Sequence, residues 1–370
     1  MTHRSSAQAW LFGPKVDAAA FLGSAVLSLL FVVACRAMGI AGDTPLWAWL
    51  LLVVFIDVAH VWSTMFRVYF DGAELQRRAS LYWGVPLLVY AFGVAAYQSS
   101  ALTFWRLFAY AALFHFIRQQ YGWISLYNRR ANVPAWERRL DTAAIYACTV
   151  GPALWWHARI PRPFWWFVPD DFIALPAVVG DLALGAMWVV LAAWACAQVV
   201  RFAQRRGVFA GRVMLIVATF IAWFGGIVLA QDDLSFTAMN VALHGVPYFV
   251  LLYRYAKNRS AEGSYGAATV MKLGVAGFLG ILFVFALLEE LLWDRLVWHE
   301  HGALFGQSPA EPVAAFLPFL IPLLALPQAT HYVLDAFIGK PKEDPALLGR
   351  LGWVKPTEPP SLTTSPARSP

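Results

Sequence analysis

Charged residues are scarce in this chain. Asp, Glu, Lys and Arg make up 14% of the 370 residues, hydrophobic residues make up 60%, and the mean hydropathy is +0.57. Soluble domains carry about 25% charged residues, because charges cover their water-exposed surface. This composition excludes an ordinary soluble domain and is typical of a protein with many membrane-spanning helices.

Cysteine is also scarce, and several motifs of well-known enzyme classes are missing. The three cysteines, Cys35, Cys148 and Cys196, lie in apolar runs and show neither disulfide nor zinc-site spacing. The chain has no glycine-rich phosphate loop, no nucleophile elbow and no HExxH zinc motif. Nothing in the sequence indicates a separate soluble domain.

Long apolar runs are abundant, and ten of them approach the length needed to cross a bilayer core of roughly 30 Å. The first run lacks a clear cleavage site, which indicates an uncleaved anchor rather than a signal peptide. We therefore predict an all-α polytopic membrane bundle of about ten transmembrane helices over residues 1–340. A Pro-, Ser- and Thr-rich tail, residues 341–370, is predicted to be disordered. The ten runs are 17–38, 46–68, 80–98, 101–127, 141–157, 173–200, 211–231, 236–255, 268–292 and 312–338.

The distribution of basic residues predicts the orientation. If ten spans alternate across the membrane, 22 of the 28 Lys and Arg fall on the side that holds both termini, and four fall on the other side. The positive-inside rule then places the N- and C-termini in the cytoplasm of a bacterial-type inner membrane. The net charge of +6 is explained by this orientation, so we expect the lipid bilayer and not nucleic acid as partner.

The loops assigned to the outer side are rich in aromatic residues. A loop with Pro and Arg is flanked by Trp155, Trp156, Trp165, Trp166 and Phe167, which predicts an interfacial lid at the level of the lipid headgroups. His157, His299 and His301 also fall in outer loops, and the His299–His301 pair is expected to be solvated. Glu289 and Glu290 are expected to lie at the outer interface.

Four histidines lie inside apolar runs, and each has a polar residue one helical turn away on the same helix face. A single intramembrane His is often only a hydrogen-bonded packing residue, but ionisable groups inside a membrane are costly and mark functional sites. Their runs, the second, fourth, eighth and tenth, cross the membrane in the same direction, so the imidazoles could form one centre or two pairs. The pairs are Asp57 and His60, His115 and Gln119, Asn240 and His244, and His331 and Asp335.

These residues predict a metal site. Imidazole suits iron, copper and zinc, so we assign the four His as metal ligands. Gln119 and Asn240 are predicted to contribute to cofactor binding. Asp57 and Asp335 are predicted to orient the imidazoles and to take part in catalysis, each beside a His of its own or of a neighbouring helix. Arg118 is predicted to pair with Asp57 or Asp335, or to anchor a substrate carboxylate.

Three functions remain open from the sequence. The first, which we rank highest, is an oxidoreductase whose four His hold a non-haem iron and which acts on an apolar lipid or isoprenoid small molecule. The second is a membrane protein that binds haem through pairs of His. The third is a transporter of protons or metal ions, because Asp, His and Arg lie in spans that contain Pro and Gly.

Overall fold

The computed structural model describes residues 10–131, 133–162, 165–204, 206–306, 314–338 and 345–353. All regular secondary structure in these ranges is helical, which confirms the predicted all-α class. The first half of the chain contains α1 (Pro14–Asp17), η2 (Ala18–Gly23), α2 (Ser24–Ala37), α3 (Leu46–Trp49), η3 (Leu50–Val58), α4 (Ala59–Trp62), α5 (Thr64–Arg67), α6 (Gly72–Arg77), α7 (Ala79–Ser99), α8 (Ala101–Ala131) and α9 (Ala135–His157). The second half contains α10 (Ala177–Ala203), α11 (Ala210–Trp223), η4 (Phe224–Leu229), α12 (Asp233–Phe236), η5 (Thr237–Val241), α13 (Ala242–Ala261), α14 (Ala268–Met271), α15 (Gly274–Trp293), η6 (Asp294–Trp298), α16 (Gly302–Phe305), η7 (Ala314–Phe316), α17 (Leu317–Leu324), α18 (Leu326–Ile338) and α19 (Pro345–Arg350).

Eight helical segments in the described part of the chain are long and apolar enough to cross a membrane, so the protein is a multi-pass membrane protein. The predicted runs 101–127 and 141–157 fall in α8 and α9, which are long helices but less apolar than the other eight. The count of ten spans and the orientation therefore stay predictions. The eight segments are Pro14–Ala37, Leu46–Arg67, Ala79–Ser99, Ala177–Ala203, Ala210–Leu229, Asp233–Ala261, Gly274–Trp298 and Ala314–Ile338.

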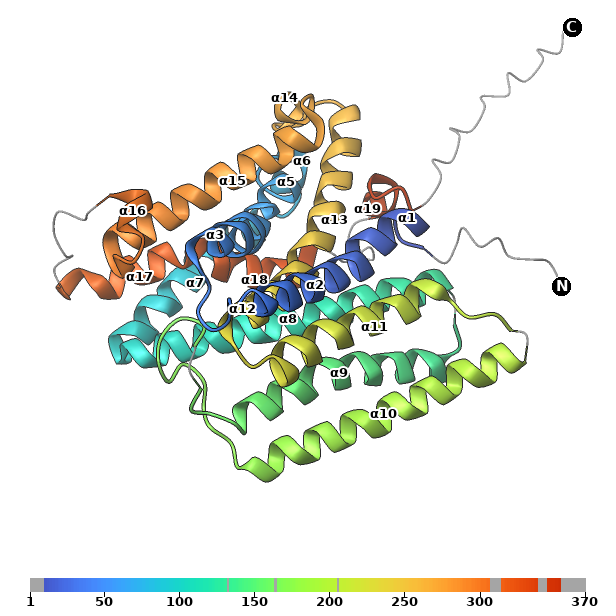
Figure 1. The fold of residues 1–370 in the computed structure, drawn as a ribbon. Helices are drawn as coiled ribbons and strands as arrows, with labels where there is room; N and C mark the ends of the chain where they lie inside the picture. The colour runs from blue at the N-terminus through green and yellow to red at the C-terminus, as the bar shows by residue number, and fades with distance from the viewer. Residues whose placement is uncertain are drawn as a thin grey trace, which may run out of the picture.

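The helices form two packed groups that meet at the centre of the bundle (Figure 1). In one group α9 packs between α8, α10 and α11, and α2 packs on α11. In the other group α15 packs on η3 and α4, while α7 packs on α17 and α18. Helix α13 contacts both α8 and α4, and α18 also contacts both, so these four helices close a ring where the groups meet.

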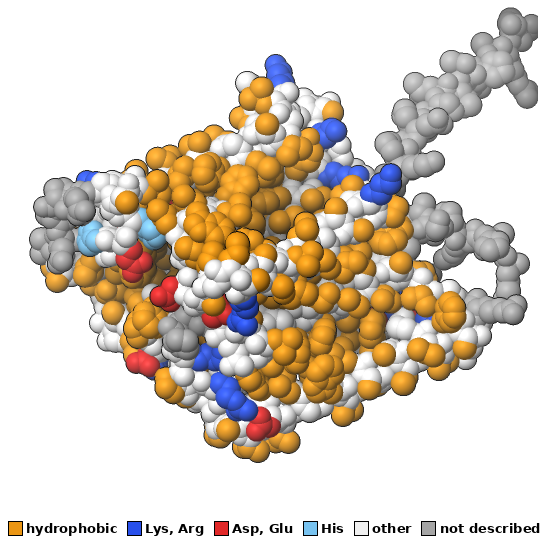
Figure 2. Space-filling view, viewed as in Figure 1, with side chains coloured by type: hydrophobic (Ala, Val, Ile, Leu, Met, Phe, Trp, Pro, Cys, Tyr) orange, Lys and Arg blue, Asp and Glu red, His pale blue; other side chains and the backbone are white. Residues whose placement is uncertain are grey.

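The surface agrees with a membrane location. Apolar side chains cover most of the face drawn in Figure 2, and the Asp and Glu side chains visible there lie toward one end of the molecule. Large apolar side chains such as Leu87, Leu88 and Val189 are about 70% exposed, which costs free energy in water but not in lipid.

Part of the segment predicted as a disordered tail is folded. Leu347 of α19 and Leu351, which follows the helix, pack against Tyr255 of α13, and Asn258 Nδ2 donates a hydrogen bond of 2.7 Å to the Arg350 carbonyl. The short apolar stretch around residues 347–351 explains this packing, which a prediction from composition alone missed. Residues 354–370 lie outside the described residues.

Candidate metal centre

The four intramembrane histidines come together at the ring formed by α4, α8, α13 and α18. Two nitrogen pairs face each other closely: Nε2 of His60 lies 2.9 Å from Nε2 of His244, and Nε2 of His331 lies 3.2 Å from Nε2 of His115. One ligand nitrogen from each of the four lies within 4.8 Å of the others, and each residue is at most 3% exposed. A metal bound at about 2.1 Å separates neighbouring nitrogens by roughly 3.0–3.4 Å, which the two close pairs match. A single ion held by all four requires the wider separations to shorten.

The ring nitrogens on the outer side of the cluster fix the orientation of two imidazoles. Nδ1 of His60 is hydrogen-bonded to the backbone carbonyl of Asp57, which can only accept, so this nitrogen carries the proton and Nε2 presents a lone pair. Nδ1 of His331 lies 2.7 Å from the Thr64 hydroxyl. Such outer partners orient metal-binding imidazoles.

The two aspartates occupy different places around the cluster. The Asp57 carboxylate lies on the helix of His60, with Oδ1 3.6 Å from Nδ1 of that residue. Asp335 faces a His on a neighbouring helix, since its Oδ2 lies 3.8 Å from Nδ1 of His115. The Tyr248 hydroxyl donates a hydrogen bond of 3.0 Å to Asp335 Oδ1 and holds this carboxylate in place.

Gln119 and Asn240 are both buried, and each lies four residues along the chain from a histidine of the cluster. Neither polar atom of the Gln119 amide has a hydrogen-bond partner among the described residues. Asn240 Nδ2 donates to the Phe236 carbonyl at 3.2 Å, and its Oδ1 has no partner in the same part of the structure. Buried amides without partners are costly, so they are candidates for contact with a bound group.

Arg118 lies away from the cluster. Its side chain is exposed, its guanidinium donates a hydrogen bond of 2.5 Å to the Tyr146 hydroxyl, and it stacks on Tyr121. Among the described residues it forms no ion pair with Asp57 or Asp335, so the predicted pairing is wrong. Arg118 follows His115 by three positions, but the α8 face it occupies points to the periphery, which sequence spacing alone did not reveal.

Packing details bring the helices close enough for the imidazoles to meet. Gly245 follows His244 directly, and a Cβ atom there would lie 2.6 Å from Cγ2 of Ile56 and 3.2 Å from its carbonyl oxygen. Two of the four His follow wide π-helical turns, since η3 ends just before α4 and η5 ends just before α13. Such turns are frequent at functional sites, and no sequence signal predicted them.

Aromatic rings complete the walls of the cluster. Phe116 stacks on the His244 ring at a centroid distance of 3.8 Å, and Tyr332 stacks on His115 at 5.0 Å. Tyr332 therefore packs against an imidazole of the cluster. The contacts of Thr64 and Phe116 were also missed, because polar spacing on one helix does not indicate contacts between helices.

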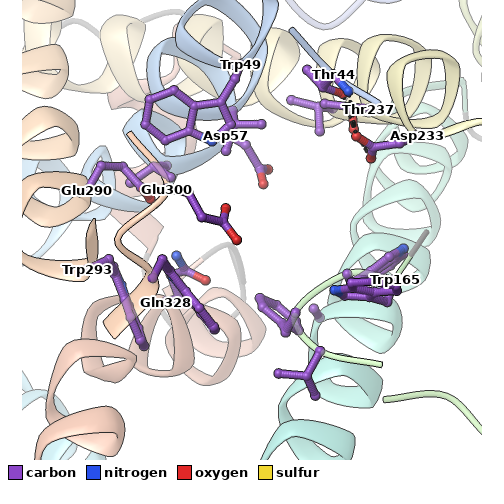
Figure 3. A pocket seen from close by; sticks show the side chains of 18 of the residues that line it. Thr44, Trp49, Asp57, Trp165, Asp233, Thr237, Glu290, Trp293, Glu300 and Gln328 are labelled. Carbon is purple, nitrogen blue, oxygen red and sulfur yellow. Dashed lines mark hydrogen bonds between the residues drawn. The ribbon is translucent and has the colours of Figure 1, made fainter. Parts of the chain in front are cut away.

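Two cavities flank the cluster. The larger, drawn in Figure 3, has a volume of about 860 Å³. Its walls include Asp57, Phe116 and Tyr332, three residues that contact the imidazoles. The smaller has a volume of about 330 Å³ and is lined by apolar side chains together with Thr64, Tyr69, Thr330 and His331. The cluster therefore has one polar and one apolar approach.

Several outer-loop residues differ from their predicted surroundings. His301 is half-buried, since its ring stacks on Trp49 at 3.9 Å, whereas His299 is exposed as expected. Glu289 is buried rather than interfacial and accepts hydrogen bonds from Trp62 Nε1 at 2.6 Å and from Gln328.

The predicted interfacial lid packs inward on the larger cavity. Trp165, Trp166 and Phe167 line that cavity. Trp166 also stacks on Trp156, with 5.8 Å between the ring centroids. His157, expected in a loop, ends α9 and is buried.

Comparison with known proteins gives no further guide. No protein-family model matches the chain, and neither a curated protein nor a solved structure matches it. The function is therefore inferred from the geometry of the four histidines and of the two cavities beside them.

Proposed function

We propose that the protein is an integral membrane metal-dependent oxidoreductase of a bacterial-type inner membrane. In this proposal His60, His115, His244 and His331 hold one non-haem iron, and the substrate is an apolar lipid or isoprenoid. The observation that carries the proposal is the convergence of four buried imidazole nitrogens within 4.8 Å of one another. Iron with four nitrogen ligands keeps coordination positions free and supplies the chemistry of dioxygen activation.

The spacing of the imidazoles favours a single ion over haem. The Nε2 atoms of His60 and His244 lie 2.9 Å apart with nothing between them, and the His115–His331 pair is similar. Two axial ligands of a haem are separated by about 4 Å with the macrocycle between them, and the close pairs leave no space for that ring.

The smaller cavity supports an apolar substrate. Its walls include Trp83 and Leu323, which are 58% and 52% exposed and so face the surroundings of the bundle, and His331 lies at its inner wall. Among the described residues no charged side chain lines it. An apolar molecule dissolved in the membrane could therefore reach the cluster sideways between α5, α7 and α18.

Transport of metal ions is the second candidate, and the larger cavity favours it because acidic residues line that cavity beside the cluster. The two functions differ in how the metal is held. An enzyme retains its metal through purification, whereas a transporter binds and releases it.

The first test is metal analysis and a visible spectrum of the detergent-purified protein. We expect about one iron per chain, no Soret band, and loss of the iron in His244→Ala. His299→Asn is the matched control, because His299 is exposed and asparagine tolerates its left-handed backbone conformation, with φ of 57°. His331→Asn provides a second ligand variant if His244→Ala does not fold.

Each other outcome decides against the proposal. A Soret band that disappears in the ligand variants would establish haem binding. Absence of retained metal and of any chromophore would favour transport, and flux assays with divalent ions in proteoliposomes would then follow. Iron that remains in both ligand variants would show that the four histidines do not hold it.

A further inference from the structure

The larger cavity has a one-sided charge. Six carboxylate side chains are among its lining residues, whereas no Lys or Arg is. Trp and Phe side chains supply much of the remaining wall. In Figure 3 Asp57, Glu290 and Glu300 stand on one side of the cavity and Asp233 with Thr44 on the other. The six are Asp43, Asp57, Asp233, Glu290, Asp294 and Glu300.

Some of these carboxylates are held by the protein and some are not. Asp233 accepts hydrogen bonds from the backbone and hydroxyl of Thr44, and Asp294 accepts from the backbone amides of Glu300 and His301. Among the described residues, the side chains of Glu290 and Glu300 have no hydrogen-bond or ion-pair partner. These two acids are free to meet a cation.

The cavity adjoins the metal centre, because three side chains of its wall also contact imidazoles of the cluster. Asp57 lines the cavity, while its backbone carbonyl accepts the Nδ1 proton of His60. Phe116 and Tyr332 also line it and stack on His244 and His115. A species that reaches the inner end of the cavity therefore lies one side chain away from the four imidazoles.

We infer that the acidic cavity is the route by which a divalent metal cation reaches the four-histidine centre. The inference rests on the proposed function, because it requires a metal at that centre. Carboxylates along a narrow, low-dielectric cleft raise the local cation concentration and raise association rates by about 10- to 1000-fold. Aromatic faces add cation–π attraction. The apolar cavity beside His331 lacks these features, so metal and apolar substrate would approach by different routes.

The test measures how fast the metal-free protein takes up Co²⁺, whose visible absorption reports imidazole binding. Glu290→Gln/Glu300→Gln replaces two carboxyl groups of the cavity wall by amides without touching an imidazole. We expect uptake at least about 10-fold slower than in the wild type, with a weaker dependence on salt and an unchanged final Co²⁺ content. Asp181→Asn is the control, because Asp181 is exposed on α10 and pairs with Arg159 outside the cavity.

The outcomes separate the route from the centre. Normal Co²⁺ content with an unchanged uptake rate in the double variant overturns the route and leaves the centre standing. Absence of Co²⁺ binding in the wild type overturns the centre itself. Unchanged Co²⁺ uptake together with binding of tetramethylammonium, lost in the double variant, would make the cavity a site for organic cations.

Discussion

Replacing Gly245 by alanine tests whether close packing of α13 on η3 sets the geometry of the metal centre. The added Cβ would lie 2.6 Å from Cγ2 of Ile56, whereas ordinary contacts begin at 3.4 Å. Ile56 is β-branched and stiff, and its carbonyl oxygen is also close, at 3.2 Å, so we expect the two backbones to separate by a few tenths of an ångström.

This displacement acts directly on two proposed ligands. Ile56 lies four residues before His60, and Gly245 follows His244, so the separation moves apart two nitrogens that now lie 2.9 Å apart. Metal–ligand distances tolerate only about 0.2 Å. Overpacking of this kind costs about 1–3 kcal/mol, which corresponds to roughly 5- to 150-fold weaker metal binding if the bound state carries the whole cost.

The assay is the dissociation constant for Co²⁺, measured by competition with a chelator on protein that elutes as a single folded species. Gly280→Ala is the control, because a Cβ at Gly280 of α15 meets no atom within 4 Å. We expect weaker binding in Gly245→Ala and wild-type affinity in Gly280→Ala. Wild-type affinity in Gly245→Ala would refute the link between this helix contact and the centre.

Two further changes test single contacts. Thr64→Val removes the hydroxyl that lies 2.7 Å from His331 Nδ1, and we expect about 10- to 100-fold weaker metal binding, which Thr64→Ser should restore; equal losses in both variants would contradict the role of the hydroxyl. Burial raises the pKa of Asp71, but hydrogen bonds from Arg259 and Tyr255 lower the pKa by more than burial raises it. The folded-state pKa therefore lies below 3.8. Stability from Asp71 is therefore present above pH 3.8 and lost as the pH falls through the folded-state pKa. Asp71→Asn should cost about 3 kcal/mol at neutral pH and flatten the fall of Tm in acid, and an unchanged Tm profile would show that the Arg259 pair contributes nothing.

The sequence predicted the class of fold and the histidine cluster for identifiable reasons. Long apolar runs are a direct consequence of the bilayer thickness, and the cost of burying imidazole in lipid singled out His60, His115, His244 and His331. That the four would share one centre was left open, because depth along a helix is readable from sequence but the mutual rotation of helices is not.

The contacts between helices could not be predicted. Arg118 and His115 lie three residues apart, yet one side chain points to the periphery and the other to the centre. The wide turns of η3 and η5 rotate all the following side chains around the helix axis. A periodicity of 3.6 residues does not describe such turns. The acidic cavity is assembled from residues between Asp43 and Tyr332, so no local pattern in the sequence marks it.

The ring of α4, α8, α13 and α18 also has a mechanical consequence. The four imidazoles belong to four different helices, so an ion bound by all of them would tie the two helix groups together at a single point. Metal binding would then contribute to the free energy of unfolding in proportion to the logarithm of the metal concentration over its Kd. The same ion would act both as a reactive centre and as a cross-link between the helix groups. Its removal would weaken the contact between the groups, beside which both cavities lie.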